Sequence, residues 1–302
     1  MSVTAVVLVV FSALVHAGWN LLGKRDSANG AYFCIASAAG ALVMFPILLF
    51  WSGAVGRMPP GVWMYLLPTG LFQALYFTGL GGAYRTGDLS VAYPVARAFP
   101  VLMVPLISAA MGSGDLPTAT AVGGMITVTA GLLVIPQDRI SRLSVSHLWG
   151  AWVLYAFLAG IGTTGYSIID DTALATYRET LGGELSSVQA PIIYSALQSA
   201  STALLLALFG AVRLGPRRLS AELRRTQLGS AAAAGVAIVG AYCLVLVAYG
   251  FARNVSYVVA FRQISLPIGT LFGVVLLGEK MNRARAAGTA LIIGGLVLVS
   301  LG

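Results

Sequence analysis

The sequence predicts an all-α integral membrane protein whose ten transmembrane helices form two inverted five-helix repeats. Three observations lead to this prediction. Of the 302 residues, 58% are hydrophobic and only 9% are charged, whereas a soluble domain carries about 25% charged residues. So little charge cannot cover a water-facing surface, so the bilayer must be the solvent for most of the chain. The other two observations are the number of long apolar stretches and the similarity between the two halves of the sequence.

Long apolar stretches with short connections fill the chain. A transmembrane helix needs about 20 mostly apolar residues, and ten such stretches fit into this length. The expected spans are 3–22, 31–51, 62–83, 90–111, 117–135, 149–169, 188–210, 228–250, 255–276 and 284–301. The first stretch ends in HAGWNLLGKR rather than at a small-residue cleavage site, so we interpret it as a spanning helix and not as a signal peptide.

The second half of the sequence repeats the first. Residues 115–133 align with residues 279–297 at an offset of 164. Two pairs of glycines then coincide, Gly124 with Gly288 and Gly131 with Gly295. One span earlier, an arginine inside an apolar run recurs in both halves, within one residue of the same offset. Duplicated apolar helices with a charged residue at matching depth are typical of membrane transporters.

Each half holds five spans, an odd number, so two copies joined in sequence must lie in the membrane with opposite orientations. This arrangement places a pseudo-two-fold axis in the membrane plane and a substrate site near its middle. We expect a first repeat at 1–135, a connecting loop at 136–148 and a second repeat at 149–302. Basic loop residues are concentrated on the side opposite the termini, so the positive-inside rule favours termini outside the cell.

Arg97 and Arg262 are the strongest candidates for a binding site. Arginine at bilayer depth costs at least about 2.5–3.5 kcal/mol, and the group cannot shed its proton. The acidic residues that could pair with these arginines lie near the ends of the predicted spans: Asp88, Asp115, Asp170, Asp171 and Glu279. Two interpretations stay open. The guanidinium groups bind a carboxylate or phosphoryl group in a central cavity, or each arginine has a structural role, in which it ties helix ends and carbonyls together or snorkels to a nearby membrane surface.

Other polar residues of the spans could line the same cavity. His16, Trp19 and Asn20 share one face of the first span. His16 could couple protons to transport, or it could be a hydrogen-bond partner between helices. Further candidates come from the third, sixth, eighth and ninth spans: Gln73, Tyr76, Tyr166, Tyr242 and Gln263. An apolar wall with few polar groups is typical of a small-molecule site. Each of these residues could instead pack between helices without contacting a ligand.

The motifs do not support enzyme chemistry. The two histidines, His16 and His147, are too far apart in sequence for a histidine-rich metal site, and no GxxxxGK phosphate loop followed by Ser or Thr is present. We therefore expect no catalytic activity, no cofactor and no metal. The basic residues are scattered over short loops, which suits a membrane surface better than nucleic acid. Cys34 and Cys243 lie inside apolar runs, so we expect no structural disulfide.

Five segments carry a family resemblance. They are LVHAGWNLLGKR, YPVARAFPVL, MGSGDLPTATAVGGMITVTAGLLVI, YVVAFRQISLPIG and LLGEKMNRARAAGTALIIGGLVLVSLG. Together they resemble the drug/metabolite transporter superfamily, specifically its EamA-type ten-helix carriers, over essentially the whole chain. Asp115 is a departure, since the family usually has glutamate at this position.

The resemblance implies secondary transport of small metabolites around a central cavity lined by spans one, three, four, six, eight and nine. Many relatives have cytoplasmic termini, which conflicts with the loop charges and leaves the orientation open. We expect a multi-pass protein of the bacterial inner membrane that exports an amino acid, organic acid or phosphonate by alternating access. It would contact membrane lipids and be able to work as a monomer. Export of cationic or hydrophobic drugs and a membrane-embedded lipid-handling role are the alternatives.

Overall fold

The computed structural model describes residues 2–26, 28–86, 89–112, 116–135, 137, 151–183, 186–277 and 281–302. All regular elements in these ranges are helices. Apart from Gln137, the predicted connection at 136–148 lies outside the described residues, as do Asp88, Asp115 and Glu279.

The first half of the chain forms α1 (Val3–Arg25), α2 (Gly30–Phe50), α3 (Ser52–Gly56), α4 (Pro60–Thr86), α5 (Leu89–Ala110) and α6 (Ala119–Val134). The second half forms α7 (Ala151–Leu181), α8 (Ser186–Leu214), α9 (Pro216–Arg225), α10 (Leu228–Tyr249), α11 (Val255–Phe261), the 3-10 turn η2 (Arg262–Ile264), α12 (Ser265–Leu277) and α13 (Arg283–Leu301).

Seven stretches among the described residues are long and apolar enough to cross a membrane. They are α1, α2, α7, α8, α10, the α11–α12 segment and α13, and α5 and α6 add shorter apolar helices. The prediction of a multi-pass, all-helical membrane protein is confirmed at this level.

The structure differs from the predicted spans in several places, and a short helix, α3, lies between the predicted second and third spans. Helix α7 continues to Leu181, well beyond the predicted end at residue 169. The chain forms a short separate helix, α9, between the predicted seventh and eighth spans. The predicted ninth span changes from α-helical to 3-10 geometry at η2 and continues directly as α12. Pro267 lies in the first turn of α12 and has no N–H to donate to the carbonyl of Gln263, which is consistent with the local departure from regular α-helical hydrogen bonding.

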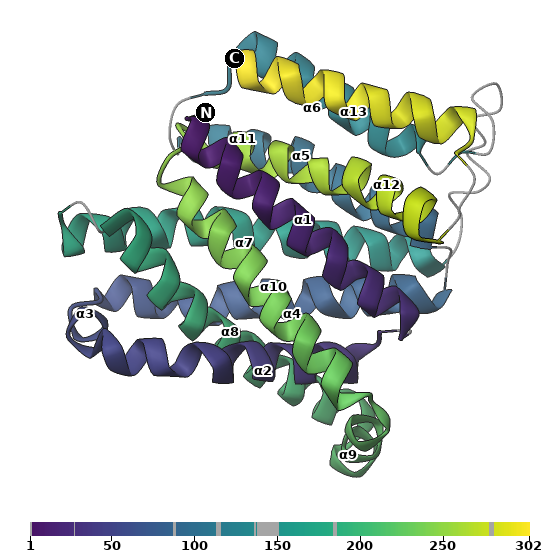
Figure 1. Cartoon of the computed structure of the whole chain (residues 1–302). Helices are drawn as coiled ribbons and strands as arrows, with labels where there is room; N and C mark the ends of the chain where they lie inside the picture. The colour runs from purple at the N-terminus through teal and green to yellow at the C-terminus, as the bar shows by residue number, and fades with distance from the viewer. Residues whose placement is uncertain are drawn as a thin grey trace.

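The helices pack as a bundle with two well-separated edges (Figure 1). Helices α6 and α13 pack side by side at one edge, and α2 and α8 pack against each other at the opposite edge. Between the edges, α1 contacts α10 and α12, and α7 contacts α4 and α5. Both chain ends lie at the end of the bundle opposite α9 (Figure 1).

Helices α6 and α13 meet backbone to backbone through glycine. Gly124 faces Gly295 and Gly131 faces Gly288, so the two helices run antiparallel. A Cβ atom on Gly124 would lie 2.6 Å from the carbonyl oxygen of Gly295, and a Cβ atom on Gly131 would lie 2.6 Å from that of Gly288. Small residues permit this approach in lipid, where packing rather than the hydrophobic effect holds helices together.

We predict that Gly124→Ala destabilises the protein by about 1–3 kcal/mol, because α6 and α13 must separate to admit the new methyl group. The measurement is thermal unfolding of purified protein in detergent. The matched control is Gly123→Ala, since a Cβ atom at Gly123 meets nothing within 4 Å. There, the better helix propensity of alanine stabilises by up to about 1 kcal/mol. Equal melting temperatures for the two variants would contradict the close contact.

Candidate functional site

A small buried cavity, which we call the central chamber, lies between α1, α4, α7, α10 and η2. Its volume is about 30 Å³, which is room for one or two water molecules. Seven of the ten residues predicted to form a site line it: His16, Trp19, Gln73, Tyr76, Tyr166, Tyr242 and Arg262. Residues far apart in sequence, from both halves of the chain, therefore meet at one place.

Arg262 is the charged group of the central chamber. It is the first residue of η2, the 3-10 turn within the ninth predicted span, and only 7% of its surface is exposed. Its Nη2 donates to the hydroxyl of Tyr166 at 3.5 Å, and its Cζ lies 5.3 Å from the ring centroid of Tyr242. A cation over an aromatic face is an attractive contact. It does not saturate the five donors of a guanidinium.

The Nη1 atom of Arg262 is buried and has no hydrogen-bond partner within the described part of the chain. A buried donor without an acceptor costs about 1–3 kcal/mol, and more for a charged group. The chamber therefore holds a positive charge with unused donor capacity. An anionic group that enters would satisfy it.

Arg97 is also buried, with 2% of its surface exposed, but it does not line the chamber. From α5, its Nη2 donates to the backbone carbonyl of Arg262 at 3.1 Å and lies 3.5 Å from the hydroxyl of Ser265. This contact supplies a donor to a carbonyl within the η2 turn. The two arginines therefore have different surroundings: Arg262 lines the chamber, and Arg97 donates to the backbone carbonyl of Arg262.

The face of α1 contributes two of its three predicted residues to the chamber. The indole Nε1 of Trp19 donates to Nδ1 of His16 at 3.2 Å, so Nδ1 is the unprotonated nitrogen of that imidazole. The amide of Asn20 instead donates to the carbonyl of His16 at 2.7 Å, within its own helix. Asn20 is therefore not among the lining residues.

Aromatic rings form much of the chamber wall. The rings of Tyr76 and Tyr166 lie 6.0 Å apart edge to face, and those of Tyr166 and Tyr242 lie 5.3 Å apart in the same arrangement. Gln73 adds an amide from α4. Gln263 is buried beside Arg262 but lies outside the wall, because its amide donates to the carbonyl of Val259 at 2.9 Å in the preceding helix turn.

A buried carboxylate adjoins the chamber. Asp170 on α7 is fully buried and accepts four hydrogen bonds from three other helices. The donors are Thr69 of α4 at 2.6 Å, Tyr194 of α8 at 2.9 Å, Gln198 of α8 at 2.6 Å and Tyr242 of α10 at 2.5 Å. We call these five residues the Asp170 network. Two donors reach each carboxylate oxygen, so the ionised group is satisfied without a cation.

Tyr242 joins the Asp170 network to the central chamber. Its hydroxyl donates to Asp170, and its ring contacts both Tyr166 and the guanidinium of Arg262. A displacement of α10 would therefore change the surroundings of the buried carboxylate and of the buried cation at once. The network ties α4, α7, α8 and α10 at the level of the chamber.

Comparison with known proteins establishes the fold only. No family model matches the sequence, and no curated protein matches it significantly. Among solved structures, 27 chains match the fold. One of them, a protein crystal structure, has a TM-score of 0.70 with 20% sequence identity over 100% of this chain and 98% of that chain. The same arrangement of helices along the full length is thus adopted by a chain with a very different sequence.

The expectation that Asp170 lies near the end of a span is wrong. The apolar run of the sixth predicted span ends at Ile169-Asp170-Asp171, but α7 continues to Leu181, so Asp170 is in the helix interior. The hydrogen bonds of the network compensate the free-energy cost of burying this carboxylate, which hydropathy alone would place at the surface. One sequence signal was available, since Tyr194 and Gln198 are four residues apart and therefore share one face of a helix.

Proposed function

We propose that this protein is a secondary transporter of small acidic metabolites, built as ten spans in two inverted repeats like the EamA-type carriers that its sequence resembles. The proposal takes α1, α2, α4, α5 and α6 as the first repeat. The second repeat is α7, α8, α10, the α11–α12 segment and α13.

Helix contacts support the internal symmetry. Exchanging equivalent helices converts the α1–α10 contact into the α4–α7 contact, and the α1–α12 contact into the α5–α7 contact. The α2–α8 and α6–α13 contacts convert into themselves. The glycine contacts have the same symmetry. Gly124 corresponds to Gly288 and Gly131 corresponds to Gly295 at the offset of 164, so exchanging the halves turns the Gly124–Gly295 contact into the Gly288–Gly131 contact. Equivalent helices that run antiparallel at the α6–α13 contact favour inverted rather than parallel copies.

The observation that carries the proposal is the position of Arg262. Its guanidinium lies in a buried chamber built from α1 and α4 of one half and from α7, α10 and η2 of the other. Transporters with inverted repeats bind substrate at the repeat interface. A buried ionisable residue in a spanning segment is by default a candidate for a functional site.

The charge of the chamber suggests the substrate class. Arg262 would bind a carboxylate, phosphonate or phosphoryl group through two parallel hydrogen bonds. The rings of Trp19, Tyr76 and Tyr166 would contact an apolar portion of the same molecule. Amino acids, organic acids and phosphonates have this combination. A cationic drug is disfavoured, because it would meet the like charge of Arg262.

A chamber of about 30 Å³ is too small for a metabolite. Transport would therefore require the chamber to enlarge and to open alternately on each side. We propose export across the bacterial inner membrane by a monomer without a cofactor, on the strength of the sequence resemblance. The surplus of basic loop residues at the α9 end favours that end as cytoplasmic.

We expect acidic metabolites to raise the melting temperature of the purified protein. A ligand at 100 times its Kd stabilises by about 2.7 kcal/mol through mass action. The screen compares each amino acid, organic acid or phosphonate with its amide or ester, which has the same shape but no charge. Counterflow of the radiolabelled hit in proteoliposomes then tests transport. Stabilisation by cationic compounds alone, or equal stabilisation by an acid and its amide, would contradict the proposal.

A further inference from the structure

Helix α9 projects from one end of the bundle (Figure 1). A second and much larger pocket is lined partly by this helix. Its volume is about 540 Å³, and it is bounded by the start of α2, the end of α4, the end of α8 and one face of α9. Four arginines line it: Arg85, Arg213, Arg218 and Arg225. We call it the basic pocket. It shares no residue with the central chamber.

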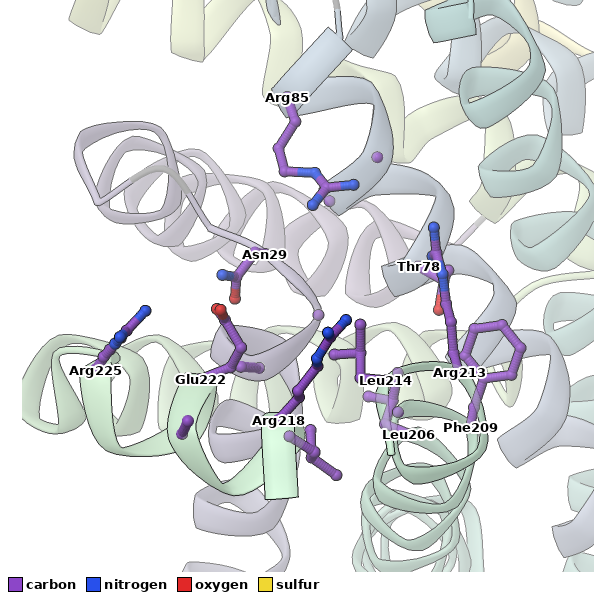
Figure 2. A pocket seen from close by; sticks show the side chains of 17 residues that line it. Asn29, Thr78, Arg85, Leu206, Phe209, Arg213, Leu214, Arg218, Glu222 and Arg225 are labelled. Atoms are coloured by element: carbon purple, nitrogen blue, oxygen red, sulfur yellow. The ribbon is translucent and has the colours of Figure 1, made fainter. Parts of the chain in front are cut away.

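The arginines come from three different helices and face one hollow (Figure 2). Arg85 extends from the last turn of α4, Arg213 from the last turn of α8, and Arg218 from α9 (Figure 2). None of the four guanidinium groups has a hydrogen bond or an ion pair within the part of the chain that the structure describes. One acidic residue, Glu222, also lines the pocket, so the charge of the lining is strongly positive.

The rest of the lining is apolar. Leu206, Phe209 and Leu214 of α8 form an apolar wall of the pocket, and 48% of the Phe209 surface and 41% of the Leu214 surface are exposed. Helix α8 is one of the stretches able to cross a membrane, and α9 follows it after a single residue. The arginines therefore lie where a spanning helix leaves the bilayer, and the apolar wall continues toward the hydrocarbon.

We propose that the basic pocket binds one anionic phospholipid, with its phosphate among the arginines and an acyl chain along the wall of α8. Guanidinium groups recognise phosphate through paired hydrogen bonds. Basic pockets between spanning helices on the cytoplasmic side are suited to anionic headgroups. A free phosphate compound would satisfy the arginines alone and would leave the exposed Phe209 and Leu214 surface uncovered. The proposal is independent of the transported substrate.

The geometry of α9 supplies a matched control. Arg218, Glu222 and Arg225 follow one another at spacings of four and three, and this face lines the basic pocket. Arg217 and Arg224 are seven residues apart on a different face and do not line it. Removal of charge from α9 can therefore be separated from removal of charge from the pocket.

The test measures the Kd of the first bound phosphatidylglycerol by native mass spectrometry of the full-length protein in detergent, with phosphatidylcholine as the neutral reference. We expect Arg213→Gln/Arg218→Gln to weaken phosphatidylglycerol binding by about 20- to 30-fold, since each arginine near an anionic headgroup contributes roughly fivefold. Arg217→Gln/Arg224→Gln should change it less than about twofold. Glu222→Gln should strengthen it, because this variant removes the one carboxylate of the lining.

Three results would overturn the proposal. Equal losses in the two double variants would show a diffuse charge effect rather than a site. Equal binding of phosphatidylcholine would show that the arginines do not select the headgroup. Displacement of phosphatidylglycerol by glycerol phosphate at a similar concentration would show a site for a soluble phosphate compound. Because Glu222→Gln is expected to increase binding, misfolding of an arginine variant cannot imitate the full pattern.

Discussion

Replacement of Asp170 with alanine is expected to lower the free energy of unfolding by about 3–5 kcal/mol. The change removes one acceptor group but leaves four donors, from Thr69, Tyr194, Gln198 and Tyr242, directed at an apolar space. Each buried donor without an acceptor costs about 1–3 kcal/mol, although some of the donors will find new partners. The measurement is thermal unfolding of purified protein in detergent, together with the yield of folded protein from membranes.

Two variants control for this effect. Asp171→Asn alters the neighbouring carboxylate, which is only partly buried, and should change stability by about 1 kcal/mol or less. Asp170→Asn keeps one acceptor oxygen but introduces an amide that cannot accept from two of the donors, so its effect should be intermediate. If Asp170→Ala unfolds at the same temperature as the unmodified protein, the network does not hold the four helices together.

Arg262→Met is expected to abolish stabilisation by acidic ligands and to leave the unliganded protein at least as stable as before. Loss of a charge-assisted pair costs about 2–3 kcal/mol of binding, or roughly 30- to 150-fold in Kd. In the absence of ligand, replacement of an incompletely bonded buried cation by an apolar chain of similar length is neutral or stabilising. Thermal unfolding with and without the strongest acidic ligand measures both quantities in one experiment.

Arg97→Met is the matched control, because it removes a second buried guanidinium that does not line the chamber. The expected pattern is the reverse. Stability without ligand should fall, since the carbonyl of Arg262 loses its donor, and the shift caused by ligand should persist in reduced form or unchanged. If Arg262→Met retains the full ligand shift, the substrate anion binds elsewhere.

Much of the chamber could be anticipated from residue type and spacing. Polar and aromatic residues inside apolar runs have few places to go in a membrane protein except an internal cavity, so His16, Gln73, Tyr76, Tyr166 and Tyr242 could be selected without coordinates. The same reasoning selected Arg262. It also selected Asn20 and Gln263, whose amides bond within their own helices. Spacing cannot separate these cases, because local backbone carbonyls compete with the cavity for every amide donor.

The Asp170 network was not predicted, because hydropathy treats a carboxylate as the end of a span and the shared face of Tyr194 and Gln198 does not by itself identify their acceptor. Whether a helix continues through an aspartate depends on whether donors from other helices reach it, and those donors are supplied by α4, α8 and α10. The basic pocket was missed for a related reason. Arg85 lies in one predicted loop and Arg213 and Arg218 lie in another, and only the packing of α9 against α8 and α2 gathers them around one hollow.

Composition and periodicity were sufficient to assign the class of this protein, since 9% charged residues cannot cover a soluble surface and apolar stretches of about 20 residues match the bilayer. The charged fraction and the length of the apolar stretches can both be read from the sequence without knowing which residues are in contact. The tertiary structure decided that Arg262 lines the chamber while Arg97 bonds a backbone carbonyl, and it decided the burial of Asp170. These outcomes depend on which groups from distant segments lie within hydrogen-bond distance. A buried charge is stable only where such partners converge.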